Sequence, residues 1–463
     1  MEPATQPIDA DLPERTRRRV ARKLIPWLFF LYILAYLDRV NIAAASLGIG
    51  QPADKGGFGF DEKFIGIASG IFFWGYWILE IPSTLSVVKW GARWVFVRIL
   101  VLWGICATLC GFLGKPILGT LLGWVPFMDG HDPADQLLIL RFLLGFFEGG
   151  FFPSVIVYLG LWFRPEDRAR AVAGFMAAIP FSNIIGSGVS TGLSKLDWLG
   201  LEGWRWIFIV EGVVPIVAGW ATLFFLPDRP EKAKWLPADE CGWLRRELNR
   251  EEAAHTSHGH FPGFKSLGLV LLLTFIYFCL NVSSYGLGMF MPSILGSQFG
   301  IPKDDIWKKI LVSALPFIPA LIAIKLNGWH SDKRKEHIWH VAIPLFLQGI
   351  GIALAAALDG IGIFSALIMI FWVGSFYYAH LPAFWPIPKT FLGTAVAASA
   401  IGFINMIGNL GGSVGPYLVG KYKNDTASFS KALFIIAPFP IVGALLILVM
   451  AYFHRRLHPP QKG

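Results

Sequence analysis

Long apolar stretches recur along this chain and constrain its fold more than any other feature. A helix needs about 20 apolar residues to cross the hydrocarbon core of a bilayer. Twelve stretches approach that length, six before and six after the longest polar segment, residues 228–265. We therefore predict an all-α membrane protein with twelve transmembrane helices in two six-helix halves. The expected spans are 24–49, 64–88, 94–122, 137–161, 169–192, 205–226, 265–297, 308–328, 338–358, 361–385, 391–420 and 431–453.

The composition agrees with a chain whose surface is shared with lipid. Hydrophobic residues make up 55% of the 463 positions and charged residues only 15%. A soluble domain carries about 25% charged residues. The composition therefore favours a polytopic membrane protein over a soluble one.

Lysine and arginine gather in alternate loops, and this bias predicts the orientation. Basic loops stay on the cytoplasmic side of a membrane. We therefore expect both termini in the cytoplasm and the chain in the inner, or plasma, membrane. The net charge of +9 is explained by these residues and by anionic lipid headgroups, so nucleic acid is not an expected partner. The basic residues are Arg15, Arg17, Arg18, Arg19, Arg22 and Lys23 before the first span, Lys89 and Arg93 after the second, Arg164, Arg168 and Arg170 after the fourth, Lys333, Arg334 and Lys335 after the eighth, and Arg455 and Arg456 after the twelfth.

The spans and loops divide the chain into five parts. The expected parts are a cytoplasmic N-terminal tail (1–23), an N-terminal six-helix half (24–227), a central cytoplasmic loop (228–264), a C-terminal six-helix half (265–454) and a cytoplasmic C-terminal tail (455–463). Glycines at packing spacing, such as Gly66 with Gly70 and Gly411 with Gly415, let helices approach closely. We expect tight bundles that can rock against one another.

Charged side chains inside two of the apolar stretches raise the question of function. Asp38 and Arg39 lie in the first predicted span, and Arg141 and Glu148 lie in the fourth. Seven residues turn a helix by about 700°, so Arg141 and Glu148 share a face and lie about 10 Å apart along it. An Arg that faces lipid near the bilayer centre costs at least about 2.5 kcal/mol, so these side chains must meet protein or water.

Two interpretations of the four charges remain open at this point. They could form a structural network of salt bridges, since the two positive and two negative charges cancel. Alternatively, they could line a polar cavity in which arginines receive an anion and carboxylates exchange protons. The planar guanidinium matches a carboxylate in two parallel hydrogen bonds, which favours the second interpretation.

The sequence also resembles a known family at several motifs. They are LDRVNIA (37–43), LRFLLGFFEGGFFPSVIVYLGLWFRPEDRARAVAGFMAAIP (140–180), WRWIFIVEGVVP (204–215) and INMIGNLGGSVGPYLVG (404–420). These motifs resemble the anion:cation symporter family of the major facilitator superfamily, and more narrowly its bacterial tartrate, phthalate and hydroxyphenylacetate permease-like branch. The resemblance runs from about Arg17 to Arg456. It implies two six-helix halves around a central cavity, lined by spans 1, 4, 7 and 10, that opens alternately to either side.

The resemblance implies roles for the charged residues and suggests others. Arg39 and Arg141 are the expected carboxylate-binding pair, and Asp38 and Glu148 are the expected proton-coupling acids. A substrate carboxylate that binds an Arg weakens the hold of that Arg on a nearby acid, so substrate and proton would load together. For Asn281, Tyr285, Tyr377 and Asn405, a structural contact with a neighbouring helix is an equally good interpretation. The full set of predicted substrate-binding residues is Arg39, Arg141, Tyr36, Asn281, Tyr285, Tyr377 and Asn405.

Two loops compare with the gating motif of the superfamily, G-x-x-x-D-K/R. The loop GWHSDKRKEH from Gly328 fits it, with Asp332 and Lys333 as the expected latch. The matching loop PSTLSVVKWGARW (82–94) keeps only part of it, Lys89 and Arg93 included, so Glu80 could contribute instead.

Other polar residues carry weaker predictions. His255, His258 and His260 in the central loop have no completing Cys or carboxylate nearby, so we expect no metal and no cofactor. Glu211 in the sixth span is expected to pair with Arg205.

The sequence favours one functional class over its competitors. It contains no phosphate loop, and no strand-to-helix turn that could carry a nucleophile elbow is predicted, so neither an enzyme nor an ATP-driven pump is expected. We predict a secondary active transporter that imports an organic anion by proton symport, acting as a monomer. An anion exchanger or facilitator of the same fold and a sodium-coupled symporter remain alternatives, and tartrate-like dicarboxylates, sugar acids and aromatic acids remain candidate substrates.

Overall fold

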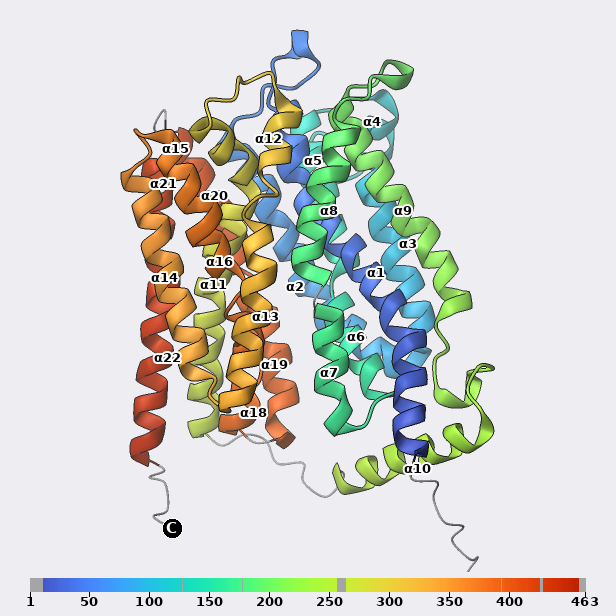
Figure 1. The fold of residues 1–463 in the computed structure, drawn as a ribbon. Helices are drawn as coiled ribbons and strands as arrows, with labels where there is room; N and C mark the ends of the chain where they lie inside the picture. The colour runs from blue at the N-terminus through green and yellow to red at the C-terminus, as the bar shows by residue number, and fades with distance from the viewer. Residues whose placement is uncertain are drawn as a thin grey trace, which may run out of the picture.

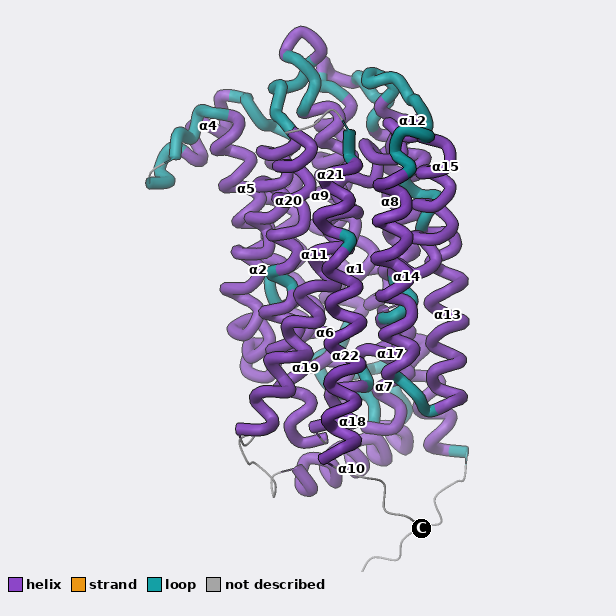
Figure 2. Tube along the Cα trace, turned by 90° about the vertical axis from the view of Figure 1, so that its left-hand side faces the viewer, coloured by secondary structure: helices purple, strands orange, loops and turns teal. Residues whose placement is uncertain are grey.

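The computed structural model describes residues 11–126, 128–176, 178–255, 264–392, 394–424 and 428–457. Within these ranges the chain forms helices joined by short loops, and it forms no strand. The long helices of the bundle run roughly parallel to one axis in both views, and α10 lies across the lower end in Figure 1 (Figures 1 and 2). The predicted all-α fold is therefore confirmed.

The first six spans correspond to α1 through α9. Between them lies one short helix that is not a span, α4 (Pro116–Leu122). The spans are α1 (Leu12–Ile49), α2 (Glu62–Trp90), α3 (Ala92–Cys110), α5 (Pro133–Glu148) with α6 (Phe151–Gly160), α7 (Pro165–Met176) with α8 (Ala178–Leu193), and α9 (Gly203–Phe225).

The last six spans follow the helix of the central loop, α10 (Ala238–His255). The tenth span contains a π-helical turn at Ile368–Val373, and α18 (Ile387–Leu392) connects the tenth span to the eleventh. The spans are α11 (Phe264–Gln298), α12 (Ile306–Val312) with α13 (Phe317–Arg334), α14 (Ile338–Ala357), α15 (Gly362–Leu367) with α16 (Gly374–Tyr377) and α17 (Leu381–Phe384), α19 (Thr394–Gly408) with α20 (Gly411–Asn424), and α21 (Ser430–Ile436) with α22 (Pro438–Leu457).

Ten helical segments in the described ranges are long and apolar enough to cross a membrane. The other two predicted spans, the fifth and the eleventh, correspond to the segments α7 with α8 and α19 with α20. The chain is therefore a multi-pass membrane protein with the predicted twelve-helix arrangement.

The first helix begins at Leu12, well before the predicted residue 24. Its basic first turns extend the helix because they pack against α10. Arg15 and Arg19 both reach the buried carboxylate of Glu240, with nitrogen–oxygen distances of 3.0 and 2.9 Å. The central loop therefore carries a helix, and that helix is anchored to the start of α1.

The third predicted span is too long, because α3 ends at Cys110 rather than near residue 122. The chain turns directly after it and passes through Gly114, whose φ of +75° lies in the left-handed region. The Gly114 N–H donates to the side chain of Gln136 at the start of α5, at 2.8 Å. The turn is therefore held by a contact distant in sequence.

The fourth span is broken directly after Glu148. Gly150 has a φ of +86°, which ends α5 and starts α6. A Cβ on Gly150 would lie 2.4 Å from the Cβ of Ser83 on α2, so the close approach of α2 also requires glycine here. The break leaves Glu148 as the last residue of α5.

The two halves contact each other mainly through α2 against α20 and α8 against α12. Glycines permit the first contact: a Cβ on Gly66 would lie 2.4 Å from the carbonyl oxygen of Pro416, and one on Gly70 would lie 2.8 Å from that of Ser413. Gly411 and Gly415 instead pack against α11 of their own half. The expected close packing at these glycines is therefore observed.

One end of the bundle carries both chain ends of the described core. The start of α1 and the end of α22 lie at the lower end of Figure 1, where α10 also lies. The α4 and α12 segments lie at the opposite end. An even number of spans requires this arrangement.

Candidate functional site

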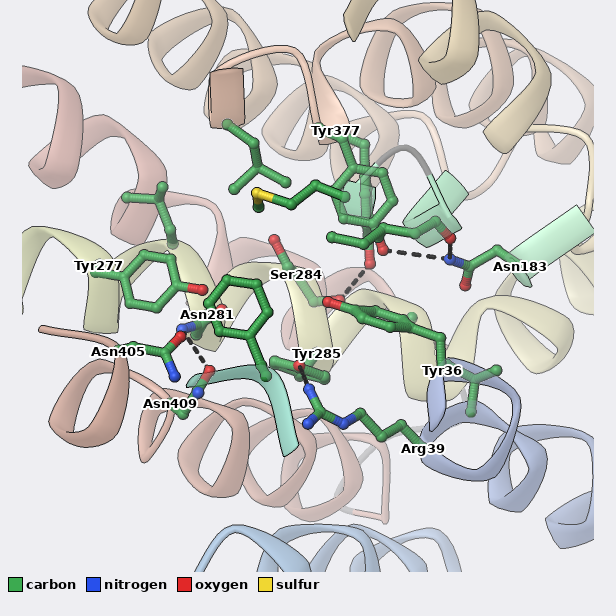
Figure 3. Close-up of a pocket in the computed structure, with 18 of the residues that line it drawn as sticks. Tyr36, Arg39, Asn183, Tyr277, Asn281, Ser284, Tyr285, Tyr377, Asn405 and Asn409 are labelled. Carbon is green, nitrogen blue, oxygen red and sulfur yellow. Dashed lines mark hydrogen bonds between the residues drawn. The ribbon is translucent and has the colours of Figure 1, made fainter. Parts of the chain in front are cut away.

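A cavity lies between the two halves, and both halves line it. The first half contributes residues of α1, α2 and α8, and the second contributes residues of α11, α16 and α19. Its wall combines one arginine with several tyrosines and asparagines (Figure 3). Such a mixture of aromatic surface and a few polar groups is typical of a small-molecule site.

Most of the predicted substrate-binding residues meet in this cavity. They come from α1, α11, α16 and α19, which are far apart in sequence. The lining members are Tyr36, Arg39, Asn281, Tyr285, Tyr377 and Asn405. Their roles in binding stay predictions.

Arg39 is held between an acid and aromatic rings. Its Nε donates to Glu148 Oε1 at 2.6 Å, and its Nη1 lies 3.5 Å from the hydroxyl oxygen of Tyr285. The guanidinium carbon lies 4.9 Å from the ring centroid of Tyr76 and 5.4 Å from that of Tyr36. Its Nη2 has no hydrogen-bond partner among the described residues. The guanidinium therefore keeps N–H groups available for an anion.

Arg141 is placed differently from the prediction. It is 1% exposed and does not line the cavity. Its Nη1 lies 3.4 Å from the backbone carbonyl of Asp38, and its guanidinium carbon lies 5.2 Å from the ring centroid of Phe72. The face of α5 that carries Arg141 is covered because α5 packs against both α2 and α3. A clamp formed by Arg39 and Arg141 facing the cavity together is not present in this structure.

Asp38 also points away from the cavity. Trp103 Nε1 on α3 donates to Asp38 Oδ2, and Asn41 Nδ2 donates to Asp38 Oδ1 at 3.0 Å. Consecutive residues on a helix point about 100° apart, so Asp38 faces α3 when Arg39 faces the cavity. Its proton-coupling role stays a prediction, and its carboxylate would act from behind the cavity wall.

Glu148 lies behind Arg39 and is fully buried. One of its oxygens binds Arg39, and Oε2 has no hydrogen-bond partner among the described residues. The pair therefore joins α1 to the end of α5 at the edge of the cavity. The salt-bridge interpretation and the cavity interpretation of the sequence are both partly realised here.

Sequence reasoning missed several residues that line the cavity. Tyr76, Asn183 and Tyr378 contribute hydroxyl and amide groups. Asn183 Nδ2 donates to the carbonyl of Ile179 at 2.9 Å and lies 3.4 Å from the Tyr378 hydroxyl, so it spans the two halves. A polar amide inside a predicted span is the signal that could have identified Asn183.

A cluster of amides forms one end of the cavity. Asn281 Nδ2 donates to the carbonyl of Gly408 at 3.1 Å and to Asn409 Oδ1 at 3.3 Å. Asn405 lies beside them, one turn from Asn409 (Figure 3). The bond to a neighbouring helix that the sequence left open for Asn281 is therefore present, and the residue still lines the cavity.

The predicted gating residues do not meet one another in the described structure. Asp332 and Lys333 are exposed at the end of α13, and Lys333 lies over the ring of Trp329 at 5.0 Å. Lys89 is exposed as well. Arg93 donates to the carbonyl of Leu226 at 3.1 Å, which joins the start of α3 to the end of α9 within one half. A latching role for these four residues stays a prediction.

Two further predictions concern Glu211 and the central histidines. The Glu211 pairing is wrong: Ser190 Oγ donates to Glu211 Oε1 at 2.8 Å, whereas Arg205 binds Glu202 at 2.5 Å. Arg205 lies nearly two turns before Glu211, and its guanidinium binds Glu202 and the carbonyls of Gly111 and Leu113 at the start of α9.

Of the three central histidines, His258 and His260 lie outside the described residues.

Two packed helical halves with a polar cavity at their junction define a membrane transport protein. The comparisons with known proteins assign its family. The chain belongs to the Major Facilitator Superfamily, whose family model matches residues 28–416. It is therefore a transporter rather than an enzyme.

Individual relatives agree with this family. The chain is 38% identical to a protein of Agrobacterium vitis named "Putative tartrate transporter", over 95% of this chain and 92% of that protein. It is 30% identical to the quinolone resistance transporter of Acinetobacter baumannii, over 95% and 96% of the two chains. An inward open structure of the xylose transporter XylE from E. coli matches its fold with a TM-score of 0.72 at 16% identity, over 96% and 97% of the two chains.

Proposed function

We propose that this protein is a secondary active transporter that imports an organic anion by proton symport with alternating access. The substrate is a carboxylate such as tartrate, a sugar acid or an aromatic acid. The protein acts as a monomer in the inner membrane, with both termini and α10 in the cytoplasm.

The observation that carries this proposal is the contact between Arg39 and Glu148 at the cavity wall. In this structure Glu148 neutralises the guanidinium. A substrate carboxylate that binds Arg39 competes for the same N–H groups. Glu148 would then be a buried charge without a full partner, which is costly, so uptake of a proton accompanies substrate binding. Substrate and proton therefore enter the same state of the transporter.

The arrangement of the halves supports alternating access. They meet closely at the end that carries α12, through α2 against α20. In transporters built from two helical halves, the halves rock against each other as rigid bodies. The cavity would then be reached from the cytoplasmic end in this state.

The relative named as a tartrate transporter supports the choice of a carboxylate, because it matches this chain over nearly its full length. Thermal-shift screening of the purified protein against tartrate, sugar acids and aromatic acids tests the substrate class. Stabilisation by at least one carboxylate, and by none of the matching neutral sugars, is the expected result.

Uptake into proteoliposomes tests the coupling. We expect a radiolabelled carboxylate to accumulate above its external concentration when the external solution is more acidic than the lumen. A facilitator would equilibrate the substrate without accumulation, an exchanger would require internal anion, and a sodium-coupled symporter would follow a sodium gradient instead. Any of these three results contradicts proton symport.

A further inference from the structure

Glu80 is a buried acid that the transport mechanism above does not use. It lies on α2, one turn after the cavity residue Tyr76, and is 2% exposed. Its Oε1 accepts a hydrogen bond of 2.7 Å from Nδ2 of Asn405 on α19. Its Oε2 has no hydrogen-bond partner among the described residues. A buried carboxylate of one half therefore binds a cavity residue of the other half.

This contact fixes the orientation of the Asn405 amide. A carboxylate oxygen accepts hydrogen bonds, so the amide must turn its NH2 group toward Glu80. The amide oxygen is then directed the other way, toward the side of Tyr277 and Asn281 (Figure 3). No hydrogen bond to this oxygen is found within the described residues. Asn405 therefore offers the cavity an acceptor.

Asn183 on the opposite half is oriented in the same way. Its Nδ2 donates to the backbone carbonyl of Ile179, which can only accept. Its oxygen is therefore also left as an acceptor, and the residue lines the cavity. Two amides from different halves thus each donate at least one N–H to the protein and keep the oxygen as an acceptor.

We propose that Glu80 is a positioning residue that turns the amide oxygen of Asn405 into the cavity, and that the cavity consequently prefers carboxylates that also carry a hydroxyl group. This inference rests on the proposed function, since Arg39 binds the carboxylate. A hydroxyl donates to the amide oxygen, whereas a substrate without one displaces water and leaves that oxygen unpaired. Loss of a hydrogen bond to a polar site is a strong source of discrimination.

The test compares acids that differ only in hydroxyl groups. Dissociation constants of the purified full-length protein are measured by calorimetry for tartrate against succinate and for mandelate against phenylacetate. We expect the wild type to bind the hydroxylated member of at least one pair about tenfold more tightly. Equal binding within both pairs overturns the inference and leaves the proposed function intact. Binding of none of the four acids contradicts both.

Variants of Glu80 test the positioning role. Glu80→Met removes the acceptor at similar volume, so the Asn405 amide can rotate. The ratio of the two dissociation constants within a pair of acids should then fall toward one. Glu80→Gln still offers a carbonyl oxygen to Asn405 Nδ2 and should keep the preference. Glu62→Met, at the start of the same helix, is the matched control. A preference that survives Glu80→Met, or one that Glu80→Gln loses as completely as Glu80→Met, contradicts the role.

A second variant covers the case in which Glu80→Met does not fold. Asn405→Leu removes the positioned oxygen and should reduce the preference for the hydroxylated acid without abolishing carboxylate binding. An unchanged ratio in Asn405→Leu also overturns the inference.

Discussion

Asp38 and Arg39 show how two adjacent charges can serve different surfaces of one helix. Arg39 reaches the cavity and Glu148, whereas Asp38 accepts hydrogen bonds from Trp103 and Asn41 behind it. A fully buried charge is tolerated only with partners. Arg39 and Asp38 have their partners on different neighbouring helices, and for this reason both charges can lie within an apolar helix.

Replacing Arg39 tests its part in anion binding. Arg39→Lys keeps the charge but cannot donate to Glu148 and to a carboxylate with one fixed planar group. We expect the dissociation constant for the substrate to rise by at least about tenfold, measured by calorimetry. Arg98→Lys, at a partly buried arginine of α3 that does not line the cavity, is the control. Unchanged affinity in Arg39→Lys contradicts the site.

The same substitution at Arg141 separates the sequence prediction from the observed placement. If Arg141 stays behind the wall throughout transport, Arg141→Lys alters thermal stability but not affinity. A loss of affinity would show that another conformation brings it to the substrate.

Glu148 is the expected site of proton coupling. Glu148→Gln removes the titrating group while keeping a polar side chain of the same size. Accumulation driven by a pH gradient should be lost, and exchange of labelled for unlabelled substrate across the membrane should remain. Proteoliposome uptake and counterflow measure the two activities on one preparation. Gradient-driven accumulation by the variant would rule out this role.

At the scale of helices, the fourth span depends on Gly150. Gly150→Ala places a Cβ against Ser83 in a backbone conformation that disfavours any side chain. We expect a loss of about 1 kcal/mol or more of stability, seen as a lower melting temperature. Gly188→Ala on α8, where a Cβ meets nothing within 4 Å, is the control and should melt at the wild-type temperature or above it. Equal melting temperatures for the two variants would contradict the packing argument.

The sequence predicts the spans well because an apolar run of sufficient length is a local property. It does not predict the break at Gly150 or the early end of α3, because contacts with Ser83 and Gln136 on other helices determine them. It predicts Arg39 in the cavity, where the structure places it. It also predicts Arg141 there, but the packing of α2 and α3 against α5 covers the face that carries Arg141, and this packing is not a local property. The bond from Asn405 to Glu80 joins residues 325 positions apart and has no local signal.

At the scale of the whole molecule, we expect the contact of α2 with α20 to control access to the cavity at one end. Gly66→Leu would force the helices apart at Pro416 and favour a state open at that end. In a cysteine-free background with Ser69→Cys on the cavity wall, we expect a several-fold faster reaction with an impermeant thiol reagent added from that side. Gly188→Leu is the control. An unchanged rate would mean that this contact does not control access.

The way Asp38 is held has a consequence for how the transporter adapts to its cargo. The helix that presents Arg39 is anchored to α3 on the side facing away from the cavity, so we expect this wall of the cavity to stay rigid during transport. Accommodation of substrates with different shapes would then fall to the facing half, where Tyr377, Tyr378 and Asn405 belong to spans interrupted by short turns or a π-helical turn. Homologues with different cargo should accordingly diverge first on that side.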